Sequence, residues 1–399
     1  MGPADVGVVN TNALAYPLVL FCVLVAACDG GGGESETTLP SAPMPVFPSS
    51  YENAKAIVLS DPNVPSPQAL GISNPTSFHG SLAFADFFQE GAYSVVVTML
   101  QYSSPAAAGH DLPSKIFFLR KNAGGNWIDA TSKLLSDRTG CITARKTLIA
   151  DFNGDGKPDV FFVCHGIDFA PFPGENQRIL LSQPDGTYSN VQLPFSGFNH
   201  GGSAADLDGD GRPDVVLASN QPQPYVLLNN GDGTSFTQVF DRLPNALSAL
   251  TFELIDTEGK GDRDLFVGDG PPDGSTTLPN GVLRNDGTGH FLTTPMTKFP
   301  NPPGPGGVVM SLALDFAYVD GWLYMTQVGN SYQDYAVRKL RLSDLAISTP
   351  YQHQGPFSDG PTYQDWLYPR KSDRKILPQG ANAVYPIDPG SSFGWSIDF

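Results

Sequence analysis

Positive charge is scarce in this sequence. It has 23 Lys and Arg residues against 40 Asp and Glu, which gives a formal net charge of −17. A chain with this excess of negative charge is repelled by the phosphate backbone of nucleic acids, so we expect no nucleic-acid partner. Many of the acidic residues lie in short Asp-rich loops, where bound cations would neutralise part of the charge.

Familiar catalytic motifs and long apolar runs are absent too. The chain contains no nucleophile elbow, Walker loop, HExxH helix or dinucleotide-binding fingerprint. The sequence therefore names no reaction, and we expect a protein that is not an enzyme. Its apolar run at residues 13–28 is shorter than the ~20 residues that a membrane helix needs. The run fits the apolar core of a secretory signal instead.

The end of this run, VAAC, resembles the lipobox of bacterial lipoproteins, in which the Cys becomes the lipidated first residue. The resemblance implies a signal peptide at residues 1–28, lipidation of Cys28, and a lipid anchor as the only membrane attachment. We therefore expect an exported protein, periplasmic or on the cell surface, held at a bacterial membrane. Residues 1–12 lack the usual Lys or Arg, so a plain cleaved signal or a short anchor is the alternative. Residues 29–50, rich in Gly, Ser and Pro, predict a flexible linker.

The sequence has only four cysteines. Cys22 would leave with the signal and Cys28 would carry lipid, which leaves Cys141 and Cys164 as an even pair in an oxidising compartment. If the strands around the first Asp-rich loop form a hairpin, the segment after Cys141 lies near Cys164. A disulfide is then geometrically possible, and two free buried thiols are the alternative.

A repeat organises the chain. An apolar run that ends in Asp recurs at Asp86, Asp151, Asp206, Asp256 and Asp315, at intervals of about 50 to 65 residues. A Gly-rich turn before an aromatic residue follows each of the first four, and such turns between β-rich segments are strong hairpin signals. Each unit therefore predicts four strands, which is the pattern of a β-propeller blade.

Two segments, DFNGDGKPDV at residues 151–160 and DLDGDGRPDV at 206–215, closely resemble the FG-GAP/VCBS repeats also found in integrin α-subunit heads. The resemblance covers residues ~80 to 330 and implies an all-β propeller of four-stranded antiparallel blades, which we place at residues 51–399. Five units are visible, and residues 340–397 could hold a sixth, of which residues 338–347 look like a fragment. We expect six or seven blade positions, one of them incomplete. The last residues either stop short of a further Asp loop or close the ring against residues 51–80.

The spacing in these two segments fits calcium, which takes about six to eight oxygen ligands at ~2.3–2.6 Å. Gly156 and Gly211 permit the sharp turn that a side chain would obstruct. The loops are not EF-hands, because Phe162 and Leu217 stand where Glu is needed. We expect two structural calcium ions, with exposed Asp-Gly turns as the alternative. The expected ligands are Asp151, Asn153, Asp155, the Lys157 carbonyl and Asp159 in the first loop, and Asp206, Asp208, Asp210, the Arg212 carbonyl and Asp214 in the second.

The other three units depart from this pattern. In the unit at residues 256–264, Lys260 stands among four acidic residues, so its ammonium could replace the ion with an internal salt bridge. Whether this loop holds metal stays open. The units at Asp86 and Asp315 keep fewer acidic residues, and we expect plain turns there.

In a four-stranded blade the Asp loops and the Gly turns share one face, and the longer loops share the other. Loops on a rigid scaffold commonly carry binding residues. We therefore expect a monomer that binds protein or carbohydrate through the long-loop face. The alternative is a propeller enzyme acting on carbohydrate, such as a polysaccharide lyase or a sugar dehydrogenase. Three histidines in these loops, His110, His165 and His200, are candidate ligands or bases, with an incidental loop position as the alternative. The aromatic residues Phe169, Phe172 and Phe198 form a rim for sugars or protein, or plug the loops against each other.

Overall fold

Antiparallel strands make up nearly all of the regular structure in the computed structural model. Two short 3₁₀ helices, η1 (Thr131–Lys133) and η2 (Pro305–Gly307), are the helical elements among the described residues. In that part of the chain, no helix has the length and hydropathy needed to span a membrane. The structure describes residues 79–101, 111–219, 223–245, 247, 249–268, 280–292, 295–310, 312–329, 334–354, 365–370, 374–380 and 397–398.

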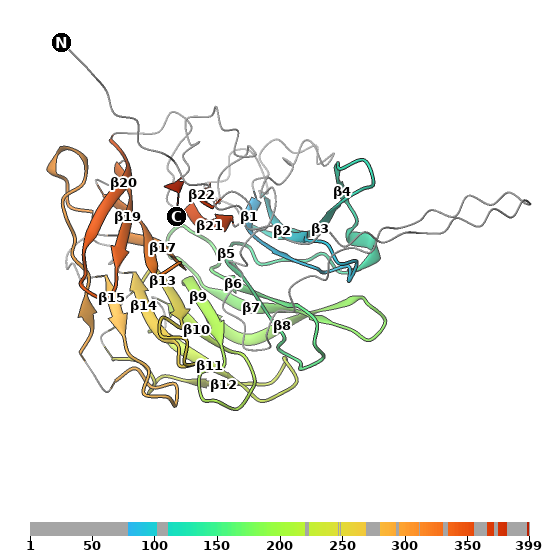
Figure 1. Cartoon of the computed structure of the whole chain (residues 1–399). Coiled ribbons are helices and arrows are strands. Elements are labelled where there is room, and N and C mark those ends of the chain that lie inside the picture. Colours follow the sequence, from blue (N-terminus) through green and yellow to red (C-terminus); the bar gives the residue numbers. More distant parts are fainter. Residues whose placement is uncertain are drawn as a thin grey trace, which may run out of the picture. The chain divides into compact units, whose positions relative to one another are not determined.

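Six antiparallel sheets follow one another along the chain (Figure 1). The first consists of β1 (His79–Ala85), β2 (Ser94–Gln101), β3 (Leu112–Lys121) and β4 (Trp127–Asp129). The second consists of β5 (Ala144–Ala150), β6 (Asp159–Cys164), β7 (Glu175–Ser182) and β8 (Tyr188–Gly197). The third consists of β9 (Asn199–Ala205), β10 (Asp214–Ser219), β11 (Tyr225–Asn229) and β12 (Phe236–Val239).

The remaining sheets continue this order. The fourth consists of β13 (Thr251–Ile255), β14 (Asp264–Gly268), β15 (Gly281–Leu283) and β16 (Thr297–Lys298). The fifth consists of β17 (Leu312–Val319), β18 (Trp322–Gly329), β19 (Asp334–Arg341) and β20 (Ile347–His353). The sixth has three strands, β21 (Asp365–Arg370), β22 (Lys375–Gly380) and β23 (Ile397–Asp398).

The sheets are the blades of a β-propeller. In each sheet the strands pair in chain order. The first strands β1, β5, β9, β13, β17 and β21 contact one another in succession, so each blade packs against the next. The predicted fold class is thus confirmed. We expected six or seven blade positions with one incomplete, and the described residues form five sheets of four strands and a sixth of three.

One prediction about the C-terminal region was wrong, since residues 338–347, taken as a fragment of a sixth unit, belong to β19 and β20 of the fifth blade. The sixth sheet lies later in the expected range, from β21 to β23. Within the described residues, the last strand β23 pairs with β22. Residues 51–78, against which the ring was expected to close, lie outside the described residues. The predicted signal peptide, lipidation site and linker, and the proposed propeller start at residue 51, lie outside the described residues.

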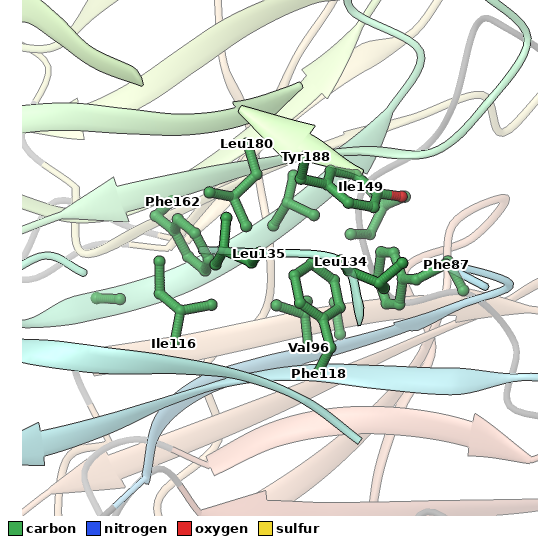
Figure 2. Close-up of a cluster of buried hydrophobic side chains, with 14 of the residues drawn as sticks. Phe87, Val96, Ile116, Phe118, Leu134, Leu135, Ile149, Phe162, Leu180 and Tyr188 are labelled. Carbon is green, nitrogen blue, oxygen red and sulfur yellow. The ribbon is translucent and has the colours of Figure 1, made fainter. Parts of the chain in front are cut away.

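The core lies between successive blades. Strand β6 reads as a continuous apolar run because both of its faces are buried. Side chains alternate along a strand, so Val160 and Phe162 pack toward the first blade while Phe161 and Val163 pack toward the third. Figure 2 shows the first of these layers, in which Phe162 lies near Ile116 of β3.

Candidate functional site

Four loops between the first and second strands of a blade share one hydrogen-bond pattern. The carboxylate of Asp151 accepts hydrogen bonds from the backbone N–H groups four and five residues further on, at 2.9 and 2.8 Å. Asp206, Asp86 and Asp256 accept hydrogen bonds from amides at the same two offsets. The first Asp of each unit therefore folds the loop, even in the units whose later acidic positions differ.

The turn depends on the glycine that lies five residues after the first Asp of the loop. Gly156 has φ 81° and Gly211 has φ 85°. This left-handed region is open to glycine at little cost, whereas a side chain would strain the backbone. The predicted reason for these two glycines is confirmed.

The last Asp of each calcium-like loop is an internal anchor. Asp159 is fully buried, and its carboxylate accepts hydrogen bonds from the backbone N–H groups of Phe152 (2.8 Å), Asn153 (3.1 Å) and Ser182 (2.7 Å). Asp214 accepts from two equivalent amides, at 3.1 and 2.8 Å. Burial raises the pKa of Asp159 and of Asp214 to about 7, against the lowering effect of these hydrogen bonds. Each anchor ties the loop to the third strand of its blade.

The first three acidic positions of the second loop converge on one point. One oxygen from each of Asp206, Asp208 and Asp210 lies within 4.8 Å of the others. The Oδ1 atom of Asp208 is buried and accepts no hydrogen bond from any described residue. Three converging carboxylates, one of them with a buried oxygen that accepts no hydrogen bond, fit a hard cation that prefers oxygen ligands. The guanidinium of Arg212 also contacts Asp210 and donates to the Asn229 carbonyl at 2.9 Å.

The first loop has fewer carboxylates at the same positions. Asn153 fills the third position, where its Oδ1 accepts the Asp155 amide at 3.1 Å and its side-chain amide donates to the Ser182 carbonyl at 3.1 Å. The Asp155 carboxylate accepts the Ser182 hydroxyl at 2.9 Å. The Lys157 ammonium donates to the Gln183 carbonyl at 3.2 Å, so its side chain points toward the neighbouring turn.

The loop of the fourth blade carries its own cations. Lys260 forms an ion pair with Glu258, as its position in the sequence suggested. A second cation, Arg284 at the end of β15, contacts Asp264 and lies 3.8 Å from Glu258. Sequence reasoning missed Arg284, which stands in the Gly-turn region and not in the Asp loop.

The assignment of a loop to Asp315 was wrong. Asp315 lies inside β17 and is fully buried, where its Oδ2 accepts the Leu367 amide at 2.7 Å. The real turn of this blade is the two-residue Asp320–Gly321, with φ values of 50° and 83°. Two residues with positive φ are typical of a type I′ hairpin.

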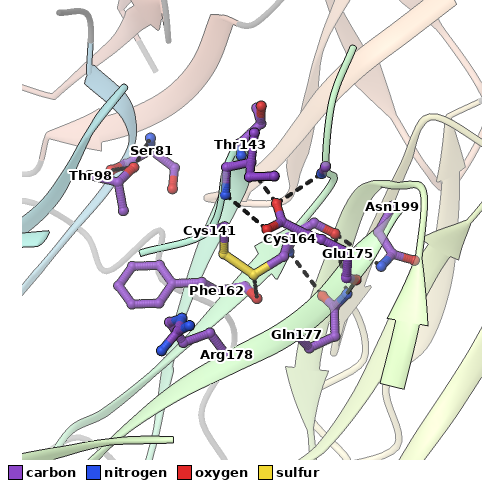
Figure 3. The surroundings of a disulfide bond; sticks show 12 residues. Ser81, Thr98, Cys141, Thr143, Phe162, Cys164, Glu175, Gln177, Arg178 and Asn199 are labelled. Carbon is purple, nitrogen blue, oxygen red and sulfur yellow. Dashed lines mark hydrogen bonds between the residues drawn. A yellow bond between two sulfur atoms is a disulfide. The ribbon is translucent and has the colours of Figure 1, made fainter. Parts of the chain in front are cut away.

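The opposite face is stapled covalently. Cys141 and Cys164 form the predicted disulfide, with Cα atoms 5.4 Å apart, and the register pairs Ala144 with Cys164 as the hairpin argument required. Figure 3 shows Glu175 beside this bond. Its carboxylate accepts three backbone N–H groups at 2.8 to 3.1 Å, and burial raises its pKa. Both sulfurs are bonded to each other, so this cluster is no metal site.

Next to the disulfide lies a cluster of two histidines and an ion pair. Arg145 Nη2 is 2.6 Å from Asp168 Oδ2 and 3.3 Å from His165 Nε2. The Nε2 atoms of His165 and His200 are 3.4 Å apart. Burial, followed by the charge of Arg145, lowers the pKa of His200 to about 3, so this ring is neutral at physiological pH. His110 lies outside the described residues.

Aromatic rings cover this cluster. Phe198 is buried, with its ring centroid 3.7 Å from that of His165 and 5.0 Å from that of His200. Phe172 packs edge-on against Phe198 at 5.7 Å and remains 44% exposed, and Phe169 is 42% exposed. Phe172 also has φ 58°, a conformation that costs a bulky residue energy. Phe198 therefore plugs the loops, whereas Phe169 and Phe172 remain an exposed rim.

A third polar cluster, absent from the predictions, joins the innermost strands. Lys146 of β5 contacts Glu253 of β13 and lies 3.9 Å from Asp315 of β17. All three side chains are buried. In the sequence, each of the three is a charged residue within an apolar strand segment, and this pattern could have indicated a buried polar cluster.

Similar solved structures are carbohydrate-active enzymes with low sequence identity. The exotype rhamnogalacturonan lyase YesX is 13% identical, with 82% of this chain and 74% of that chain covered, at a TM-score of 0.39. An α-L-arabinofuranosidase from Fusarium graminearum is 13% identical, covers 83% and 93%, and has a TM-score of 0.45. A GH43_1 enzyme from Xanthomonas citri is 9% identical, covers 84% and 96%, and has a TM-score of 0.36. At these values the similarity says nothing about a reaction or a ligand.

The family model matches the blades that carry the two calcium-like loops. No curated protein sequence is significantly similar to the chain. The model of the FG-GAP-like repeat matches residues 151–217 and 206–267, which run from the Asp loop that follows β5 in the second blade, through the third blade, into β14 of the fourth. Together with the arrangement of the sheets, this match shows that the chain is a β-propeller that contains FG-GAP-like repeats.

Proposed function

We propose that this protein is an exported, calcium-stabilised propeller that binds a glycan or a protein ligand through the face opposite the Asp loops. The observation that carries the proposal is the pair of exposed rings, Phe169 and Phe172, on a loop braced by the buried Phe198. Exposed aromatic rings on a rigid base offer contact area at a small entropic cost. Strained backbone at Phe172 is also more frequent at functional sites than elsewhere.

Binding is favoured over catalysis by the state of the histidines beneath these rings. His165 is fully buried, so it cannot contact a ligand without rearrangement. His200 has a pKa of about 3, far from the neutral range in which a general acid or base is efficient. We therefore assign the cluster of Arg145, Asp168 and the two histidines to supporting the aromatic loop.

Calcium is proposed as a structural ion at two loops. The expected ligands include Asp151, Asn153 and Asp155 in the second blade and the converging carboxylates of the third. The loop of the fourth blade is excluded from this proposal because Lys260 and Arg284 already pair with two of its acidic residues, Glu258 and Asp264. Cation binding would relieve the repulsion among clustered carboxylates.

The disulfide supports a location outside the cytoplasm, because such bonds persist in oxidising compartments. We propose that the chain is attached to a bacterial membrane through lipid on Cys28, in the periplasm or at the cell surface. The net charge of −17 supports a partner other than nucleic acid. We further propose that the propeller acts as a monomer.

A glycan array followed by calorimetry tests the binding proposal. Phe172→Ala and Phe169→Ala should each weaken binding about fivefold, since an aromatic contact contributes about 1 kcal/mol. Leu292→Ala is the matched control, because Leu292 is 50% exposed and lies in a loop of the Asp-loop face. An equal loss of affinity in Leu292→Ala would contradict the assignment of the binding site to Phe169 and Phe172. Release of sugar products during incubation would favour the enzyme alternative.

A further inference from the structure

Three buried ionisable side chains meet between the inner strands of three blades. Lys146, Glu253 and Asp315 are 4%, 2% and 0% exposed. The Lys146 ammonium contacts Glu253, donates to the Phe252 carbonyl at 3.4 Å, and lies 3.9 Å from Asp315 Oδ1. The proposed function gives these residues no role, because they lie neither in the Asp loops nor at the aromatic rim.

We propose that Lys146 and Asp315 join in an intramolecular isopeptide bond and that Glu253 carries the protons for this reaction. One ammonium and two carboxyl groups meet here among the described residues. Burial disfavours the charged form of a carboxyl group, and a second carboxylate close by favours protonation of one of the two. A protonated Asp315 beside a Lys146–Glu253 ion pair contains every group that amide formation requires.

The reaction balances without an added reagent. Glu253 takes a proton from the Lys146 ammonium, and the neutral Nζ attacks Cγ of the protonated Asp315 carboxyl. Glu253 returns the proton to the departing hydroxyl, which leaves as water, and then takes a second proton from the new C–N nitrogen. One C–N bond forms, one C–O bond breaks, and Glu253 ends protonated. No atom is oxidised or reduced.

The backbone around Asp315 suits this role. Its Oδ2 accepts the Leu367 N–H at 2.7 Å. The same donor would stabilise the negative charge that develops on this oxygen in the tetrahedral intermediate. Oδ1, the oxygen on the Lys146 side, is then the one that leaves. Glu253 is held in turn by Ser203, whose hydroxyl is 3.5 Å from its Oε2.

The bond would tie the second blade to the fifth. Strands β5 and β17 belong to sheets that are three positions apart in chain order, and a link between them would prevent the blades from separating. Such a clamp suits an exported protein that must persist without intracellular quality control.

Peptide mapping of the reduced full-length protein tests the proposal. Trypsin should cleave after Arg145 but fail to cleave after Lys146. The peptide that begins with Lys146 should be joined to the peptide of residues 299–338, and the mass of the pair should be lower by one water. The link should vanish in Lys146→Arg and Glu253→Gln and persist in Glu258→Gln, a matched exposed control. Separate unmodified peptides in the wild type, or a link to Glu253 in place of Asp315, would overturn the proposal. The wild-type map decides this even if a variant fails to fold.

Discussion

Replacing Asp159 with Ala should destabilise the propeller even when no calcium is present. Three backbone N–H groups, those of Phe152, Asn153 and Ser182, donate to this carboxylate. Leaving one such buried donor unsatisfied costs about 1 to 3 kcal/mol. Water that enters the site will satisfy some of the three N–H donors, so we expect the free energy of unfolding to fall by about 4 kcal/mol. In a chain of this size that corresponds to about 8 °C in Tm.

Thermal melts in excess chelator and in excess calcium provide the assay, with Asp155→Ala as the matched variant. Asp155 is exposed and accepts only the Lys157 amide and the Ser182 hydroxyl. Its removal should lower Tm by about 2 °C in chelator, at about 1 kcal/mol for such bonds. It should also abolish the rise in Tm that calcium gives the wild type.

The two variants separate an anchor from a ligand. If Asp159→Ala melts no lower than Asp155→Ala in chelator, the buried carboxylate does not hold the loop, and the anchor argument fails. If calcium raises the Tm of Asp155→Ala as much as that of the wild type, the first loop is not a calcium site. A calcium-dependent rise in the Tm of Asp155→Ala would not affect the argument that Asp159 anchors the loop.

Three more variants test the stapled face and the fourth blade. Replacing Cys141 and Cys164 with Ser should cost about 3 kcal/mol for a loop of 23 residues, seen as a drop in Tm under non-reducing conditions. His200 keeps a lowered pKa in the fold, so its contribution to stability is full above pH 6.5 and is lost as the pH falls toward 3. His200→Gln should reduce the loss of stability between pH 7 and pH 5 by about 2 kcal/mol, measured by urea unfolding. Arg284→Ala should lower stability in chelator by about 1 kcal/mol through its partly exposed pair with Asp264, and an unchanged urea midpoint would contradict this.

The repeat pattern of the sequence predicted the blades well because each Asp loop is a local structure. The first Asp bonds to amides only four and five residues away, so spacing alone identifies the turn. Once the hairpin at residues 150–159 was assumed, the strand register placed Cys164 opposite the chain after Cys141. Both predictions needed only contacts within a single hairpin.

Contacts between distant segments were not predictable in the same way. Asp315 follows an apolar run as the loop residues do, yet the strand continues to a two-residue turn at Asp320. The role of Arg284 depends on the pairing of β14 with β15, across a loop of variable length. Lys146 meets Glu253 only when blades two and four are both in place. No local spacing encodes these meetings.

The source of compensating charge differs from blade to blade while the backbone of the turn stays the same. In the first blade the Ser94 hydroxyl accepts the Phe87 amide at 3.1 Å, so the anchor position carries no charge, and Arg120 contacts Glu90 of the loop. The second and third blades keep the acidic positions, and we propose calcium there. The fourth supplies Lys260 and Arg284.

This exchange has a functional consequence. If the ion took part in ligand recognition, a side-chain cation could not replace it in one blade without the loss of that role. A scaffold ion can be replaced in this way, because the turn requires only that its negative charge be balanced. The variation among blades therefore supports our proposal that the Asp-loop face maintains the fold and that a ligand binds at the face that carries Phe169 and Phe172.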